Sequence, residues 1–296
     1  MRNAFAKDLV DLARIDKSIF LITGDLGFSV LEPFSNEFPD RFLNIGIAEQ
    51  NMTGVAAGLA KEGYTVFTYS IGNFPTLRCM EQIRYDVCYH NLNVKIIAVG
   101  AGYAYGPLGV SHHTTEDLGM LRTIPNLTVA SPSDPFEVSA ITKMFVETNG
   151  PCYMRLNKTG ESKLHGSVPD LSGNEPLKLC AGTEKLVLGT GAIVQEAVKV
   201  AKEKGWELWS FPIVSPMGKK WITDDLLRFK EIISIEEHQL NSGFGSAVLE
   251  VINDVYVSRK LTKYPNIRRV GIPNIFLGFS GSQEYLRNKA QLSLLL

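Results

Sequence analysis

The stretch RFLNIGIAEQN, residues 41–51, places one carboxylate, Glu49, at the start of a segment built from small residues. The segment that follows, residues 52–63, contains Gly54, Ala56, Ala57, Gly58 and Ala60. Glycines lower the helix propensity of such a segment, but small side chains allow its backbone to lie close to a neighbour. A carboxylate facing this packed region would be partly dehydrated, which indicates a chemical role. The alternative is that Glu49 caps a helix N-terminus, where the helix dipole favours a negative charge.

The composition is that of a globular protein large enough for two domains. The chain has 296 residues, 45% of them hydrophobic, and a net charge of -1. Its 30 Lys and Arg residues nearly balance its 31 Asp and Glu residues and form no basic stripe, so we expect no nucleic-acid partner. No apolar run reaches the roughly 18 residues of a membrane helix, so we expect no membrane span.

The four cysteines are widely spaced and show no metal-ligand pattern with histidine. We therefore expect buried, reduced thiols and a cytoplasmic location, and we expect no metal site in this chain. These residues are Cys79, Cys88, Cys152 and Cys180.

Short apolar runs alternate with helical segments, which predicts an α/β protein with parallel sheets. The expected strands of a first domain, residues 1–160, are 19–23, 65–69, 94–99 and 127–130, and its expected helices include 76–91 and 136–147. Residues 161–178 are rich in Gly, Pro, Ser and charge and predict a linker. In the second domain, residues 179–296, we expect strands at 185–188, 208–213, 231–236 and 268–272, with helices at 193–204 and 245–256. Two consecutive parallel-sheet α/β domains are therefore predicted.

A series of motifs runs along nearly the whole chain in a characteristic order. They are TGDLG (23–27), NIGIAEQN (44–51), LRCMEQIRYDV (77–87), GVSHHTTEDL (109–118), IPNLTVASPSD (124–134), GPCYMRL (150–156), LVLGTG (186–191), SIEEHQLNSGFGSAV (234–248) and GFSGSQEYL (278–286). In these motifs the chain resembles the pyrimidine-binding and C-terminal domains of the transketolase family. The agreement extends far beyond a single short match.

The resemblance implies thiamine diphosphate as the cofactor, whose reactive chemistry belongs to its thiazolium carbon. Glu49 would be catalytic, hydrogen bonding the aminopyrimidine ring nitrogen and favouring the imino tautomer. Tyr69 and Phe74 are expected to stack on the pyrimidine ring, with Ile47 beside the same ring. Plain core packing is the alternative for the two aromatic residues.

The resemblance also implies a substrate site. His112 and His113 lie in the Gly-rich segment AGYAYGPLGVSHH, residues 101–113. His112 is expected to be catalytic, contacting substrate oxygens and transferring protons, with His113 beside it at the substrate. Arg155 and Arg78 are expected to meet a substrate phosphate, and Lys158 is a further candidate. Ordinary surface salt bridges are the alternative for these cations.

The chain departs from the family pattern in its substrate loop. The usual Asp-Gly-Pro-Thr-His is replaced by LGVSH, residues 108–112. The position at which the family carries a further phosphate-binding cation falls near Ala101. Leu108 cannot accept the hydrogen bond that an aspartate accepts from a sugar hydroxyl. The acceptor pocket is therefore expected to be altered.

Transketolases also hold the diphosphate through Mg²⁺ in a domain marked by Gly-Asp-Gly, and this sequence contains no such tripeptide. We therefore expect a separate subunit to supply that domain and the bound Mg²⁺, in an α2β2 assembly whose active site lies between chains.

These features predict one subunit of a split transketolase that transfers a two-carbon ketol unit from a ketose donor to an aldose acceptor. The alternatives are the beta subunit of a 2-oxo acid dehydrogenase, a decarboxylating enzyme like deoxyxylulose-phosphate synthase, and a non-catalytic scaffold partner. The donor and acceptor sugars are not specified by the sequence.

Overall fold

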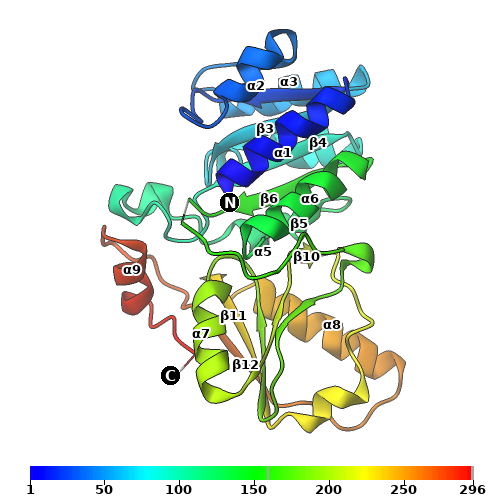
Figure 1. Ribbon diagram of the computed structural model, residues 1–296, viewed down its shortest axis with the longest axis vertical. Coiled ribbons are helices and arrows are strands. Elements are labelled where there is room, and N and C mark those ends of the chain that lie inside the picture. Colours follow the sequence, from blue (N-terminus) through cyan, green and yellow to red (C-terminus); the bar gives the residue numbers. More distant parts are fainter. Residues whose placement is uncertain (159, 295–296) are drawn as a thin grey trace.

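The computed structural model describes residues 1–158 and 160–294. Residues 159, 295 and 296 belong to the predicted domain ranges but lie outside the described residues. Figure 1 shows two α/β units stacked along the long axis, the N-terminal unit above and the C-terminal unit below. The chain is therefore organised as two domains with separate sheets.

The helices and strands alternate along both domains. The α-helices are α1 (Arg2–Ile15), α2 (Glu32–Glu37), α3 (Glu49–Lys61), α4 (Met80–Gln82), α5 (Asp117–Leu121), α6 (Pro135–Glu147), α7 (Val194–Lys204), α8 (Phe244–Ser258) and α9 (Gln283–Lys289). The strands are β1 (Ile19–Thr23), β2 (Phe42–Asn44), β3 (Thr65–Ile71), β4 (Val94–Val99), β5 (Thr128–Ala130), β6 (Cys152–Leu156), β7 (Leu177–Cys180), β8 (Lys185–Gly189), β9 (Glu207–Ser210), β10 (Ile213–Ser215), β11 (Glu231–Gln239) and β12 (Ile267–Ile272).

The first sheet has the order β10-β5-β6-β4-β3-β1-β2 and is parallel except for β10. Helices α1 and α6 cover one face of this sheet, as Figure 1 shows. Phe5 of α1 and Ile141 of α6 join the core on this face. Helix α3 covers the other face through Met52 and Ala56. The central strands β3 and β4 are consequently buried on both faces, as is usual for parallel strands.

The edge strand β10 corrects one expectation. Residues 208–213 were expected to form one strand, but the chain forms β9 in the second sheet and then β10 in the first. Pro212 separates the two strands and has no N–H to continue a ladder. β10 pairs antiparallel with β5, so a segment of the second domain completes the sheet of the first.

The segment 76–91 is helical, but it is not the regular α-helix that its periodicity predicts. A 3₁₀ turn (Leu77–Cys79) leads through α4 into a π-helical segment (Ile83–Tyr89). Ile83, Val87 and Cys88 are buried, so one face of the segment packs into the core, whereas Leu77 at its start is 37% exposed. A π-helix widens the backbone and is frequent at functional sites.

The second sheet has the order β12-β11-β8-β9-β7, with β7 antiparallel to β9. It is thus mainly parallel, as predicted, with one antiparallel edge that begins inside the expected linker. In Figure 1, α7 and α8 lie on different sides of this sheet. Among the described residues, no helix is both long and apolar enough to cross a bilayer.

A buried polar network joins the two domains below the first sheet. The Arg155 guanidinium lies 3.3 Å from Asp117, and the Tyr153 hydroxyl donates a hydrogen bond to the same carboxylate at 2.6 Å. From the second domain, the buried His238 accepts a hydrogen bond from the backbone of Gly119. Because buried polar groups need partners, this network holds the domains in one relative position.

Candidate active site

The predicted site residues gather where parallel strands of the first sheet end. In such sheets the carboxyl ends of the strands lie along one edge, which is where ligands bind. β2 leads to Glu49, β3 to Phe74 and Arg78, β4 to Tyr105 and His112, and β6 to Lys158. The topology thereby collects residues separated by more than a hundred positions.

Glu49 is the first residue of α3 and its side chain is only 1% exposed. Its Oε2 lies 2.7 Å from Nη1 of Arg78, and Ser70 Oγ donates a weak hydrogen bond to Oε1 at 3.4 Å. The helix N-terminus adds a favourable dipole for the negative charge. This buried carboxylate is therefore held by one cation that is itself 46% exposed.

Phe74 connects Arg78 to His112. The Arg78 guanidinium lies 4.7 Å from the Phe74 ring centroid, and the Phe74 and His112 rings meet edge to face at 5.2 Å. Ser111 Oγ is 3.0 Å from His112 Nδ1. Burial lowers the pKa of His112, so its imidazole is neutral at pH 7 and can accept a proton.

Tyr105 and Lys158 continue the line of contacts beyond His112. The Tyr105 ring centroid lies 6.4 Å from that of His112, and Lys158 Nζ lies 5.4 Å from the Tyr105 ring. We call the resulting line, Glu49, Arg78, Phe74, His112, Tyr105 and Lys158, the contact row. It has a buried carboxylate at one end and an exposed ammonium at the other.

The two loops that carry Phe74 and His112 are bound directly to each other. Asn73 Nδ2 donates hydrogen bonds to the carbonyls of Ser111 and His113. Gly72 lies so close to Thr114 that a Cβ at this position would overlap Thr114 Oγ1, and its φ of +24° is unusual for other residues. The close approach of these loops therefore requires a glycine.

The structure does not bring Tyr69 to the contact row, which corrects one of the two predicted stacking residues. Tyr69 is 3% exposed and stacks on Phe5 of α1 with ring centroids 6.0 Å apart. Its neighbour Ser70 points to the opposite face of β3, where Glu49 lies. Because side chains alternate along a strand, Tyr69 and Glu49 are on different sides of the sheet. Phe74 remains as the candidate aromatic contact.

Arg155 is also corrected, because it lies inside β6 in the buried network at the domain junction. Its side chain is 3% exposed, and Nη2 donates to the carbonyls of Thr114 and Glu237. These partners leave it no access to a substrate phosphate. The exposed cation at the end of the same strand is Lys158, three residues further on.

The remaining predicted residues have distinct positions. His113 is buried and packs edge to face on Tyr103 with centroids 5.0 Å apart, whereas Phe74 pairs with His112. Ile47 is 79% exposed in the turn before α3, close in sequence to Glu49. Arg78 is at the site, with Glu49 as its partner.

Two members of the site neighbourhood were missed by the sequence analysis. Tyr105 was quoted as part of a Gly-rich loop but given no role, although an aromatic residue in a loop between a strand and two histidines was a usable signal. Ser70 lies within a buried strand and contacts Glu49. No pattern in the sequence distinguishes it from other buried strand residues.

A cluster of Asp134, Glu137 and His165 has ligand atoms close enough to hold a metal ion. These atoms already have partners. Asp134 Oδ1 accepts from Glu137 N, and its Oδ2 accepts from the backbone of residues 164 and 165. Glu137 accepts from Ser133 N and lies 2.9 Å from His165 Nε2. The cluster is thus explained as the N-terminal cap of α6.

Comparison with known proteins agrees with this architecture. The models for the transketolase pyrimidine binding domain and the transketolase C-terminal domain match residues 1–160 and 176–293. A transketolase C-terminal section from Methanocaldococcus jannaschii is 33% identical over 97% of this chain and 90% of that protein. A subunit of an apulose-4-phosphate transketolase from Phocaeicola vulgatus is 32% identical over 92% of this chain and 87% of that protein.

Among solved structures, a split gene transketolase described as an inactive beta4 tetramer is similar to this chain with a TM-score of 0.85 and 30% identity. The structural match covers 99% of this chain and 93% of the chain in that structure. The chain belongs to the transketolase family. It carries the pyrimidine-binding and C-terminal domains of that family, as its motifs predicted.

Proposed function

We propose that this chain is the pyrimidine-binding subunit of a split, thiamine-diphosphate-dependent transketolase. It transfers a two-carbon ketol unit between a ketose donor and an aldose acceptor in complex with a companion subunit. The observation that carries this proposal is the buried Glu49 carboxylate at the carboxyl edge of the sheet, beside the Phe74–His112 pair. The test is a ketol-transfer assay of the reconstituted pair with a panel of phosphorylated and free sugars.

The residues at this edge are chemically suited to an aminopyrimidine. A buried carboxylate is an acceptor for the N–H group of a flat heterocycle, and Phe74 offers an aromatic face nearby. Glu49, Phe74 and Ile47 would hold the ring. Arg78 would either move away from the Glu49 carboxylate or share that carboxylate with the ring. When bound, the cofactor supplies the thiazolium carbon that makes and breaks the carbon-carbon bond. Glu49 then controls the proton at the ring nitrogen, while His112 accepts or donates a proton at substrate oxygens.

The companion subunit is part of the proposal. It carries the Gly-Asp-Gly domain that binds the diphosphate and Mg²⁺, in an α2β2 complex in the cytoplasm. The companion subunit is supported by the Phocaeicola vulgatus relative, which is itself named as one subunit of a transketolase. The cytoplasmic location is supported by the buried cysteines, which form no disulfide. Light scattering after gel filtration should show that the mixed subunits form a larger complex than this chain forms alone. Full ketol transfer by this chain alone would contradict the proposal.

Lys158 is proposed as the cation that meets an anionic end of the sugar. Replacing it with Met should raise KM for a sugar phosphate at least about tenfold, because one charge-assisted hydrogen bond is lost, with little change in kcat. KM for the corresponding free sugar should not change. The control is Lys163→Met, which removes an exposed lysine that packs on Phe136 instead. Equal KM values in both variants would exclude this role.

The pH dependence should report His112. Burial lowers its folded-state pKa, so the neutral form is present at pH 7 and the acid limb of kcat/KM should lie below pH 6.5. Activity should be retained above that limb and lost as His112 becomes protonated. His112→Gln should lower kcat/KM about 10²- to 10⁴-fold. His90→Gln, at an exposed position, is the control, and an unchanged rate in His112→Gln would refute the assignment.

The same assays separate the other functions considered. Release of CO₂ from a 2-oxo acid without ketol transfer would identify decarboxylating chemistry instead. Absence of turnover with every substrate, despite a stable complex that binds thiamine diphosphate, would favour a scaffold role.

A further inference from the structure

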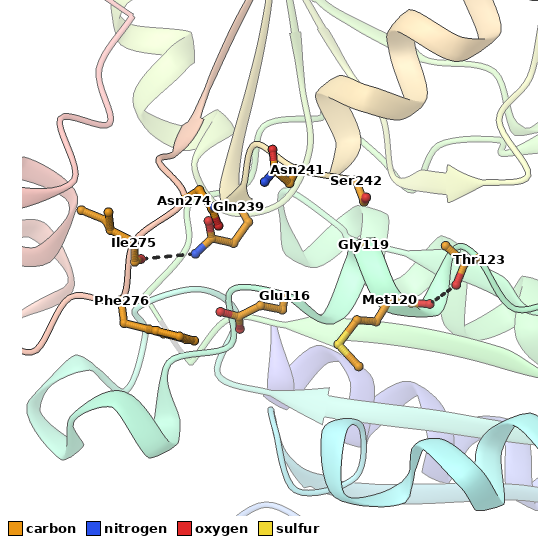
Figure 2. Close-up of a pocket in the computed structure, with 10 residues that line it drawn as sticks. All are labelled: Glu116, Gly119, Met120, Thr123, Gln239, Asn241, Ser242, Asn274, Ile275 and Phe276. Atoms are coloured by element: carbon orange, nitrogen blue, oxygen red, sulfur yellow. Dashed lines mark hydrogen bonds between the residues drawn. The ribbon is translucent and has the colours of Figure 1, made fainter.

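Two adjoining cavities lie between the domains, apart from the contact row. The first has a volume of about 450 Å³ and the second about 230 Å³. Both are lined by Glu116 and Met120 of the first domain and by Ile275 and Phe276 of the second. Figure 2 shows residues of both domains around the first cavity. We call the two cavities together the junction groove.

The first cavity contains two buried oxygen atoms without partners. Oε1 of Glu116 and Oε1 of Gln239 make no hydrogen bond to any residue that the structure describes. Gln239 is 8% exposed, and its orientation is set by Nε2, which donates to the carbonyl of Ile275 at 3.4 Å. The amide oxygen is thereby left as an acceptor, and an unsatisfied buried acceptor is unfavourable without a ligand or water.

The second cavity adds further acceptors. Burial lowers the pKa of His113, so the imidazole is neutral at pH 7, and a hydrogen bond to the backbone of Gly106 uses one ring nitrogen. The other nitrogen, Nε2, is buried without a partner in the described part of the chain, and so is Oδ1 of Asn73. Unpaired acceptors are therefore distributed over four side chains along the groove.

Among the described residues that line the groove there is neither lysine nor arginine, and Glu116 is the one carboxylate. An anionic phosphate or sulfonate group would therefore meet a negative charge and several acceptors. A single small cation cannot contact acceptors that are distributed over both cavities, so it would leave some of them unpaired. A ligand with several separated hydroxyl groups can donate to all of them.

The rim of the first cavity suits the same kind of ligand. Asn241 and Asn274 each present an amide donor and an amide acceptor, which match neighbouring hydroxyl groups. Phe276 is 78% exposed, and Figure 2 shows Phe276 and Met120 on either side of Glu116. Small-molecule sites commonly combine such an apolar surface with a few placed polar groups.

We propose that the junction groove binds an uncharged polyhydroxylated molecule, such as a free pentose or its alditol, at a site separate from the contact row. The ligand donates hydrogen bonds to Glu116, Gln239 and His113 and packs its carbon chain against Phe276. Because its contacts come from both domains, bound ligand stabilises their relative position by mass action. This site is additional to the proposed function and requires neither the companion subunit nor the cofactor.

The test uses the full chain alone, with ribitol as the probe. Saturation-transfer NMR and a ligand-dependent rise in melting temperature should both show saturable binding. D-ribose 5-phosphate should bind the groove more weakly than ribitol. Glu116→Gln and Gln239→Leu should each weaken ribitol binding at least about tenfold, since each removes one acceptor. Asn274→Leu, on the exposed rim, should also weaken it and keeps the test decisive if Gln239→Leu does not fold.

Two control variants separate the groove from other sites. Glu147→Gln removes an exposed carboxylate of α6, and His112→Ala removes the imidazole of the contact row. Both should bind ribitol like the wild-type chain. No saturable binding would overturn the proposal, because it would mean that water alone satisfies these acceptors. Equal affinity for ribitol in all variants would also overturn it. So would tighter binding of ribose 5-phosphate or methylammonium to the groove, identified as binding that Glu116→Gln alters and His112→Ala does not.

Discussion

Replacing Glu49 with glutamine lowers ketol transfer by the reconstituted complex at least about 10³-fold, because the amide cannot exchange the proton that the carboxylate controls. Glutamine has nearly the same shape, so the buried site remains filled. Arg78 loses its partner but is 46% exposed and stays hydrated, so the free energy of unfolding should change by no more than about 1 kcal/mol. Steady-state kinetics and urea unfolding of the same preparation measure the two effects.

The matched control is Glu62→Gln, which removes an exposed carboxylate at the other end of α3. It should retain wild-type turnover. If Glu49→Gln also turned over at the wild-type rate, the assignment of Glu49 would be wrong. If Glu49→Gln unfolded instead, the carboxylate would be a structural element whose partner is Arg78.

Replacing Arg155 with methionine should lower the free energy of unfolding by about 3 to 5 kcal/mol. The substitution leaves the Asp117 carboxylate buried without its cation and removes the donor to the carbonyls of Thr114 and Glu237. Urea unfolding followed by circular dichroism measures the loss. Asp117→Asn in the same background should recover part of it, because the uncompensated charge is then gone.

Arg14→Met is the control for this substitution. Arg14 pairs with Glu37 at the surface, at 2.7 Å, and its loss should cost less than about 1 kcal/mol. The experiment also separates the two roles considered for Arg155. A raised KM for a sugar phosphate at unchanged stability would restore the substrate role that its position in the motif suggested.

The arrangement of Glu49 was largely predictable from sequence. The short strand β2 before it was not predicted. Small residues follow Glu49 and a helix begins at it, so local patterns place the carboxylate at the start of a helix. The same applies to His112, which lies in a Gly-rich loop after a buried strand. Residues in such loops are positioned by backbone features that short sequence patterns describe well.

The faces of buried strands were not predictable in the same way. Phe67, Tyr69 and Ile71 alternate with Thr68 and Ser70 in β3, but all of these residues except Ile71 are buried. Because both faces of the strand are covered, the alternation does not show which face meets Glu49. β6 is buried throughout as well, which hid the difference between Arg155 inside the strand and Lys158 beyond its end. In both cases the side-chain direction follows from the register of neighbouring strands.

The sequence by itself determined the two α/β domains, the family, and the presence of a carboxylate at the start of a helix and of an imidazole in a loop after a strand. Those properties depend on periodicity and on contiguous motifs. The tertiary structure decided which cation meets Glu49, which cation is buried at the domain junction, and that β10 joins the sheet of the other domain. These outcomes depend on contacts between distant residues, whose geometry is set only when the sheets and domains pack together.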